Sequence, residues 1–425
     1  MHKIGIFTDL HLGIKKDDLK RVSVAEETVD YVIKTCKENN VEHVYFMGDW
    51  WHSRTKIGVT TLDRGQDIVK RLYESFNTTF ILGNHDIHYK NNTDVHSLKF
   101  LKLGHDSRIN LVESIQDTEI FGKKILLIPW LPRSLDCHDA FKEAVEKLNH
   151  NSYDLILGHL DLDITFFIQD YMQDKIKKNS KVDSSQVYSY LNEMGFIDEN
   201  KSFLDYDKIK QQLEHVEEQK PYLSHFMNLC RPNGLVLSGH YHKHIEYNLD
   251  DNKKFIFVGA PLEMTWADMD NPKGFYILDL AKDSTTFFEN PKGPKHKYFY
   301  YSQIKENPKL INPETVTPKT IAKLIVDCEY EVIDVYKVVQ SINALTPFED
   351  LTADNIEYLF SKSNGVEDLT SSSPNINFKM SKLNSIIDFI NKIDGKILEE
   401  RKLDRNKLIQ LAASYYNRYT ESTNE

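Results

Sequence analysis

Side chains that can bind metal ions follow five short apolar runs in the first 242 residues of the chain. Each run has the length and the content of β-branched or aromatic residues that are typical of a strand buried on both faces. Each run ends in Asp, Asn or His, in most cases directly after a glycine. The runs are IGIFTDLH (4–11), VYFMGDWWH (44–52), FILGNHD (80–86), LILGH (155–159) and LVLSGHYH (235–242). The pattern predicts an α/β sheet whose strands carry functional groups at their carboxyl ends.

In an open α/β sheet, ligands bind outside the carboxyl ends of the strands. The five runs would bring Asp9, His11, Asp49, Asn84, His159, His240 and His242 to one edge. Together these side chains offer enough carboxylate, amide and imidazole groups for two metal ions.

Each run taken alone also has a purely structural explanation. A single histidine after a strand is more often a hydrogen-bonded structural residue than a ligand, and Asp-x-His at 9–11 occurs by chance in many proteins. Gly-Asn-His-Asp at 83–86 is much rarer. Because all five runs show the same order of strand and then ligand, a metal centre is the favoured interpretation.

The ordered motifs resemble those of the calcineurin-like metallophosphoesterases over roughly residues 1–285. The resemblance implies a four-layer αββα sandwich with a two-metal centre. One ion would be held by Asp9, His11, Asp49 and His242, and the other by Asp49, Asn84, His159 and His240, with Asp49 as the bridge. The resemblance also implies that His85 is the catalytic histidine that meets the phosphate, and that Asp86 orients it.

Mixed oxygen and imidazole ligands suit divalent ions such as manganese, with magnesium, iron and zinc as alternatives. The absence of cysteine from the motifs argues against a structural zinc site. Two ions that share a carboxylate lie roughly 3.5 to 4 Å apart, hold phosphate oxygens and supply a hydroxide for in-line attack. An imidazole such as that of His85 suits the leaving alcohol, which needs a proton.

Three details favour DNA as the substrate. His52 stands three residues after Asp49, as in the SbcD-type double-strand-break repair nucleases of this superfamily. The stretch 83–92 looks similar to the nuclease subunit of phage recombination complexes, and so does 258–266 followed by 273–275. A structural explanation is the alternative for two of these details. The stretch that begins at 258 would then be a strand, a proline turn and a further strand, and His52 would support a metal ligand instead of positioning the substrate.

The predicted function is therefore a manganese-dependent DNA nuclease, with exonuclease and endonuclease activity, in recombination or double-strand-break repair. A metal-dependent phosphodiesterase or phosphatase that acts on nucleotides or phosphoproteins is the alternative. A metal-bound scaffold that only recruits a partner is a third, which the complete ligand sets disfavour.

Charge and composition bear on how the protein could bind DNA and on the compartment in which it acts. The formal net charge of −11 is unfavourable for holding DNA by bulk electrostatics, so metal ions or a basic partner would have to compensate. The four cysteines are scattered, as in a reducing compartment. The sequence leads directly into the first strand, and its longest apolar runs are too short to span a bilayer. We expect a cytoplasmic protein (host cytoplasm if phage-encoded) without a membrane segment.

Two linkers, 289–294 and 361–375, divide the chain. We expect a nuclease domain at 1–288 with a helical insertion at about 165–222, a small α/β capping domain at 298–362 and a helical pair at 376–419. In the capping domain, the pattern predicts a strand at 321–328, a helix at 336–345 and a strand at 356–360. In the resembled nucleases, the capping domain helps to grip duplex DNA.

The helical pair carries apolar stripes at 383–393 and 408–419 that need a partner surface. In the resembled family such a pair docks on the coiled-coil base of an SMC-like ATPase, and the nuclease forms a homodimer. Folding of the pair back onto the capping domain is the alternative.

Overall fold

The computed structural model describes residues 2–89, 92–102, 107–131, 146, 148, 152–162, 223–330, 332–349, 351–352 and 355–359. The chain forms two compact units, Met1–His296 and Lys297–Glu425. The predicted insertion at 165–222 and the predicted helical pair at 376–419 lie outside the described residues.

The first sheet of unit 1 has six strands in the order β12-β11-β1-β2-β3-β4. Their bounds are β1 Lys3–Phe7, β2 His43–Phe46, β3 Asn77–Ile81, β4 Ile109–Val112, β11 Gly274–Asp279 and β12 Ser284–Glu289. Strands β1 to β4 pair in parallel, and β11 and β12 add antiparallel edges. Three of the five predicted strands are therefore adjacent and parallel, so their carboxyl ends meet at one edge.

The second sheet has the order β5-β6-β7-β8-β10-β9. Its strands are β5 Gln116–Ile120, β6 Lys123–Ile128, β7 Tyr153–Gly158, β8 Cys230–Ser238, β9 Ile245–Asn248 and β10 Lys254–Phe257. Strands β6, β7, β8 and β10 pair in parallel. The other two predicted strands, β7 and β8, are thus neighbours in this sheet.

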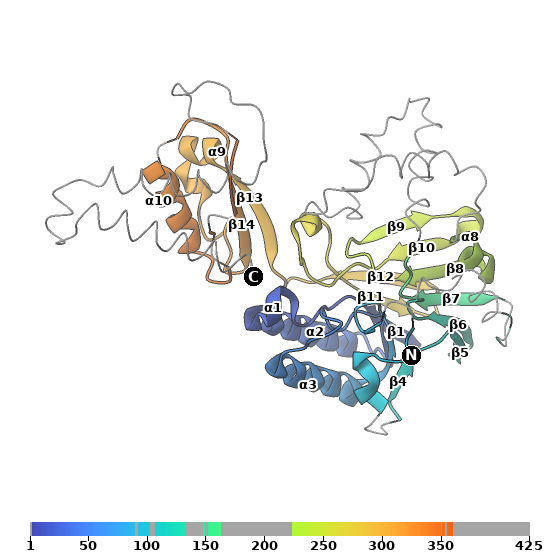
Figure 1. Cartoon of the computed structure of the whole chain (residues 1–425). Coiled ribbons are helices and arrows are strands. Elements are labelled where there is room, and N and C mark those ends of the chain that lie inside the picture. The colour runs from blue at the N-terminus through green and yellow to red at the C-terminus, as the bar shows by residue number, and fades with distance from the viewer. Residues whose placement is uncertain are drawn as a thin grey trace, which may run out of the picture. The chain divides into compact units, whose positions relative to one another are not determined.

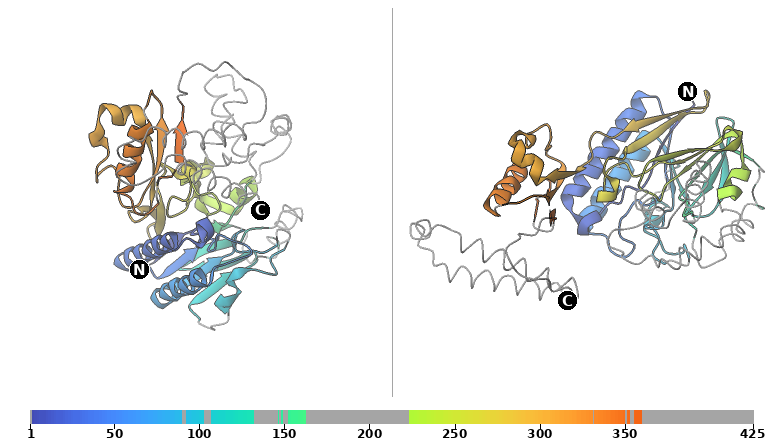
Figure 2. Two further views of the ribbon diagram at one scale, coloured as in Figure 1. Left: turned by 60° about the vertical axis from the view of Figure 1, so that its left-hand side comes forward. Right: turned by 90° about the horizontal axis from the view of Figure 1, so that it is seen from above.

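A shared hydrophobic core joins the two sheets face to face. It takes Ile6 and Tyr45 from the first sheet and Leu127, Leu157 and Leu237 from the second. Helices α2 (Leu19–Glu38) and α3 (Val59–Ser75) cover the outer face of the first sheet (Figures 1 and 2). On the outer face of the second sheet, residues of α8 (Leu223–Leu229) belong to a separate hydrophobic core that they form with the strands. These four layers confirm the predicted αββα sandwich.

Small residues let the helices approach the first sheet closely. A Cβ on Gly5 of β1 would lie 2.8 Å from the sulfur of Cys36 in α2. A Cβ on Gly65 of α3 would lie 2.3 Å from the ring of Trp51, which follows β2. Trp51 is fully buried and comes two residues after Asp49. The packing of α3 against Trp51 therefore helps to position the backbone segment that carries Asp49.

Unit 2 has a sheet of the order β13-β14-β15 with its own hydrophobic core. The strands are β13 Lys295–Tyr300, β14 Thr320–Val326 and β15 Ile356–Tyr358, and the helices are α9 Tyr301–Glu306 and α10 Val332–Asn343. The strand, helix and strand predicted in this region are confirmed as β14, α10 and β15.

Short helical segments complete the described elements: α1 Ile14–Asp17 and the 3-10 turns at Ser97–Lys102, Asp250–Asn252, Trp266–Asp268 and Pro308–Leu310. In the described part of the chain, every helix is too short or too polar to cross a bilayer.

We predict that Gly65→Ala destabilises unit 1, although alanine is favoured over glycine inside a helix by about 1 kcal/mol. The added methyl would overlap the Trp51 ring, and overpacking of this kind costs roughly 1 to 3 kcal/mol. Calorimetry should therefore show a lower melting temperature for Gly65→Ala.

The matched control is Gln66→Ala at the next, exposed position of α3, which should leave the melting temperature close to that of the wild type. A Gly65→Ala protein that melts at or above the wild-type temperature would disprove the close contact with Trp51.

Candidate metal centre

All seven predicted ligands meet where the carboxyl ends of the two sheets come together. The loops after β1, β2 and β3 supply Asp9, His11, Asp49 and Asn84, and those after β7 and β8 supply His159, His240 and His242. Backbone hydrogen bonds tie the loops together: Asp9 N donates to Gly48 O at 2.9 Å, and His11 N donates to Asp49 O at 3.0 Å. Between the sheets, the His159 ring bonds to Met47 O through Nδ1 at 2.7 Å.

One cluster of ligand atoms contains Asn84, His159, His240 and Asp49. The Asn84 side-chain oxygen lies 2.9 Å from His159 Nε2 and 2.9 Å from His240 Nδ1. Asp49 Oδ2 lies 3.5 Å from His159 Nε2. Ligand atoms that share one ion, with bonds of about 2.1 Å, lie about 3 Å apart. The four atoms therefore have the spacing of a single coordination sphere.

The second cluster contains Asp9, His11 and His242, again with Asp49. His11 Nε2 lies 3.0 Å from His242 Nε2, 3.5 Å from Asp49 Oδ2 and 3.8 Å from Asp9 Oδ1. Asp9 Oδ1 is buried and has no hydrogen-bond partner among the described residues. An unsatisfied carboxylate oxygen beside two imidazole nitrogens is unfavourable unless a cation lies between them. This donor set fits a divalent metal ion.

Asp49 links the two clusters. Its Oδ2 atom lies 3.5 Å both from His11 Nε2 and from His159 Nε2. Its Oδ1 atom accepts a hydrogen bond from the backbone amide of His85 at 2.7 Å. One oxygen that faces two ligand clusters is the arrangement expected of a bridging carboxylate.

Four ligands have left-handed backbone conformations that side chains rarely adopt. The φ angles are 53° at Asp9, 48° at His11, 60° at Asp49 and 82° at His240. Such conformations cost of order 1 to 3 kcal/mol each and persist only where the surroundings impose them. The strand pattern predicted which residues reach the edge, but it gave no sign of this strain.

Asp86 has a role that differs from the predicted one. Its carboxylate accepts hydrogen bonds from the backbone amides of Asp49 (2.9 Å), Trp50 (3.0 Å), Trp51 (3.3 Å) and Gly83 (3.0 Å). Burial raises the pKa of Asp86 to about 7, whereas four N–H donors favour its ionised form. Among the described residues, Asp86 makes no hydrogen bond with the His85 ring. The expectation that Asp86 orients His85 is thus corrected: Asp86 fixes the loop that carries Asp49.

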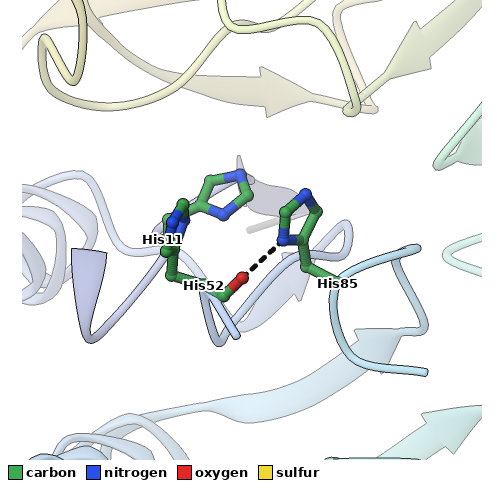
Figure 3. A group of neighbouring side chains, drawn as sticks. All are labelled: His11, His52 and His85. Carbon is green, nitrogen blue, oxygen red and sulfur yellow. Dashed lines mark hydrogen bonds between the residues drawn. The ribbon is translucent and has the colours of Figure 1, made fainter. Parts of the chain in front are cut away.

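His85 is held by the backbone of His52 instead (Figure 3). His85 Nδ1 donates to the His52 carbonyl oxygen at 2.5 Å, which leaves Nε2 available. The His52 and His85 rings stack with centroids 5.6 Å apart, and the His85 ring lies 4.7 Å from that of His11. His52 and His85 therefore lie beside the Asp9–His11–His242 cluster.

Several supporting residues escaped the sequence analysis. Asp161 Oδ1 lies 3.4 Å from His240 Nε2, where it can fix that ring with Nδ1 facing inward. The buried Lys273 ammonium bonds to Asp268 at 2.7 Å and to the carbonyl of His242 at 2.6 Å. The stretches 258–266 and 273–275 stood out in the sequence only through their resemblance to phage nuclease subunits. The buried Lys273–Asp268 ion pair leaves no sequence pattern of its own. Arg54, in the loop after His52, was missed as well.

The protonation states of the candidate ligands differ between the two clusters. Burial lowers the pKa of His11 well below its ordinary value and that of His242 to about 4, which keeps both rings neutral. Burial raises the pKa of Asp9 to about 7. Burial also opposes the charge on His159, but Asp49 and Asp9 outweigh it and raise the His159 pKa to about 9.

Metal binding should therefore release protons, because Asp9 and His159 bind metal only when deprotonated. Both pKa values are raised, so protons compete with metal at His159 below about pH 9 and at Asp9 below about pH 7, and metal affinity should decrease as the pH falls through this range. Calorimetric titration with Mn²⁺ at pH 6.5, in buffers of different ionisation enthalpy, should show a heat that depends on the buffer. A heat that is the same in every buffer would contradict these assignments.

Loss of the shared carboxylate should affect both ions. We predict that Asp49→Asn, which tolerates the left-handed backbone, lowers the affinity for both metals by roughly 100-fold or more. Metal content after dialysis measures the effect. Asp30→Asn is the control, since Asp30 pairs with Arg71 on the surface of α2. An Asp49→Asn protein with two tightly bound ions would exclude the bridge.

Comparison with known proteins gives a sequence similarity to a phage nuclease subunit. The chain is 24% identical to exonuclease subunit 1 of Enterobacteria phage T4 over 289 residues, which are 68% of each protein. No protein-family profile matches the chain. The similarity to an exonuclease subunit and the candidate ligand clusters together support a metal-dependent phosphodiester hydrolase.

Solved structures show weaker likenesses. A novel archaeal phosphodiesterase is 13% identical with a TM-score of 0.29, covering 68% of this chain and 99% of that one. A dimetal phosphatase from Danio rerio is 11% identical with a TM-score of 0.33, covering 68% and 96%. Scores this low carry no weight for the fold, which rests on the sheet order and packing. The chain has an αββα sandwich with two clusters of candidate metal ligands where its sheets meet, and its sequence is similar to that of a phage exonuclease subunit.

Proposed function

We propose that this protein is a DNA nuclease that hydrolyses phosphodiester bonds with two divalent metal ions, manganese being the expected metal. The observation that carries the proposal is the position of Asp49 Oδ2, which lies 3.5 Å from a ligand nitrogen of each cluster. Two ions held in this way would neutralise phosphate charge and activate a water molecule.

The residues of the chain supply the remaining functions. His85 Nδ1–H donates to the His52 carbonyl, so a proton given to the leaving alcohol would come from Nε2 of the doubly protonated ring. The His85 backbone amide also binds Asp49 Oδ1, which couples the position of the ring to the bridging carboxylate. Asp86 holds the loops of both residues in place through backbone amides.

The choice of DNA over a small phosphodiester rests on two supports. The T4 relative is an exonuclease subunit. His52 stacks beside His85 at the metal centre, where substrate positioning is the role expected for it. Exonuclease and endonuclease activity, and service in recombination or double-strand-break repair, belong to the same proposal.

The predicted assembly stays a prediction. The helical pair at 376–419, which would bind an SMC-like ATPase, lies outside the described residues. The capping role of residues 298–362 and the homodimer likewise remain expectations from the resemblance.

Activity tests the proposal directly. Wild-type protein with Mn²⁺ should degrade linear duplex DNA and hydrolyse bis-p-nitrophenyl phosphate. His85→Ala should keep both ions, because His85 is in neither of the two clusters assigned as metal sites, but turnover on both substrates should fall by about two to four orders of magnitude. His2→Ala is the control, since His2 is exposed and stacks on Phe121.

Two results would change the interpretation. Loss of metal from His85→Ala would make His85 a ligand, which is a possibility because its ring groups with those of His11 and His52. A wild-type protein that cleaves the small diester but leaves DNA intact would favour the alternative, a phosphodiesterase for small substrates.

A further inference from the structure

Arg54 lies at the metal centre, within electrostatic range of the Asp49 and Asp86 carboxylates but not bonded to either. Its guanidinium is partly buried, and Nη1 lies 3.5 Å from the Ile87 carbonyl, at the limit of a hydrogen bond. Its central carbon lies 5.7 Å from the centroid of the Trp130 ring. Within the described residues, no carboxylate forms a salt bridge with Arg54. A partly buried cation thus contacts only neutral groups.

These contacts hold the guanidinium in place but use few of its hydrogen-bond donors. A guanidinium has five N–H donors in a rigid fork, and one long bond to a carbonyl engages one of them. Trp130 follows β6 of the second sheet, whereas Arg54 follows β2 of the first, so the cation is held where the two sheets meet. Such a group has the geometry of a preformed anion site.

Asn84 supplies a second donor at the same point. When its side-chain oxygen faces His159 and His240, as a metal ligand must, its amide nitrogen lies 3.1 Å from Arg54 Nη2. Two N–H donors that face each other at this distance cannot bond to one another. Turning the amide round would satisfy Arg54, but it would remove the oxygen from the ligand cluster. Only an acceptor shared by both nitrogens satisfies Arg54 and the metal cluster together.

We propose that Arg54 and the Asn84 amide together bind a non-bridging oxygen of the scissile phosphate. The site would accept phosphodiesters and inorganic phosphate, both of which present an anionic oxygen. Because Asn84 would bind metal through its oxygen and phosphate through its nitrogen, it aligns the phosphate with one of the ions. Arg54 then stabilises the charge that develops on the phosphate oxygens during attack. The substrate role of Arg54 rests on the proposed phosphodiesterase function.

The test compares the full-length, Mn²⁺-loaded wild type with Arg54→Met and Arg54→Lys. Methionine keeps an apolar stem against Trp130, and lysine keeps the charge but not the fork. Arg71→Ala is the control, because that arginine pairs with Asp30 on the helix surface. The readouts are metal content, melting temperature, kcat and KM for bis-p-nitrophenyl phosphate, and the affinity for inorganic phosphate measured by calorimetry.

Arg54→Met should keep two ions and the wild-type melting temperature. Its kcat/KM should fall by about 100- to 1,000-fold, as when one transition-state donor is removed, and phosphate should bind roughly tenfold or more weakly. Arg54→Lys should recover part of both losses, and Arg71→Ala should match the wild type. Phosphate affinity and kcat/KM that stay unchanged in Arg54→Met would overturn the proposal, and so would a loss of metal or of thermal stability that accounts for the lost activity.

The two proposals fail in different ways. If the wild type hydrolyses neither DNA nor the small diester, the proposed function is wrong. Phosphate binding by the metal-loaded protein still tests Arg54 in that case. Weaker binding in Arg54→Met supports the anion site, and equal binding removes it.

Discussion

The carboxylate of Asp86 is the constraint on which the metal centre depends. It is buried under the loop after β2 and accepts four backbone amides, three of them from the consecutive residues Asp49, Trp50 and Trp51. These bonds hold Asp49 in a left-handed conformation that the residue would not adopt in a free chain. Gly48 and Gly83 make this possible, because a Cβ on Gly83 would lie 2.2 Å from the Asp49 amide nitrogen. The position of Asp49 between the two clusters of candidate ligands is therefore imposed by backbone hydrogen bonds.

The opposite side of the centre is fixed by a second buried charge. Lys273 bonds to Asp268 and to the His242 carbonyl, and the other Asp268 oxygen accepts the backbone amides of Met264 and Thr265. Both sets of bonds are fully or nearly fully buried, where they are strong and where losing one partner is costly. Asp86 thus holds loops of the first sheet, and Lys273 holds the loop after β8 of the second. The ligands stay together because both sheets are anchored behind them.

The strand pattern was sufficient to predict which candidate ligands share one edge, for a simple reason, whereas the αββα sandwich was implied by the family resemblance. Strands buried on both faces have a continuous apolar pattern, and their carboxyl ends share an edge, so a polar residue after each strand can be placed without coordinates. Interactions through backbone atoms leave no such pattern. The role of Asp86 beside His85 was implied by the family resemblance alone, whereas its hydrogen-bond partners are backbone N–H groups, which every residue except proline has. Arg54 could not be recognised either, since its position depends on Trp130, which lies 76 residues away and in the other sheet.

The proposed centre depends above all on two ions that share Asp49. A crystal structure of the full-length protein grown with Mn²⁺, with data collected at the manganese absorption edge, tests this claim most directly. We expect two anomalous peaks roughly 3.5 to 4 Å apart on either side of Asp49. One peak would be surrounded by Asp9, His11 and His242, and the other by Asn84, His159 and His240. A single peak, or two peaks without Asp49 between them, would contradict this expectation.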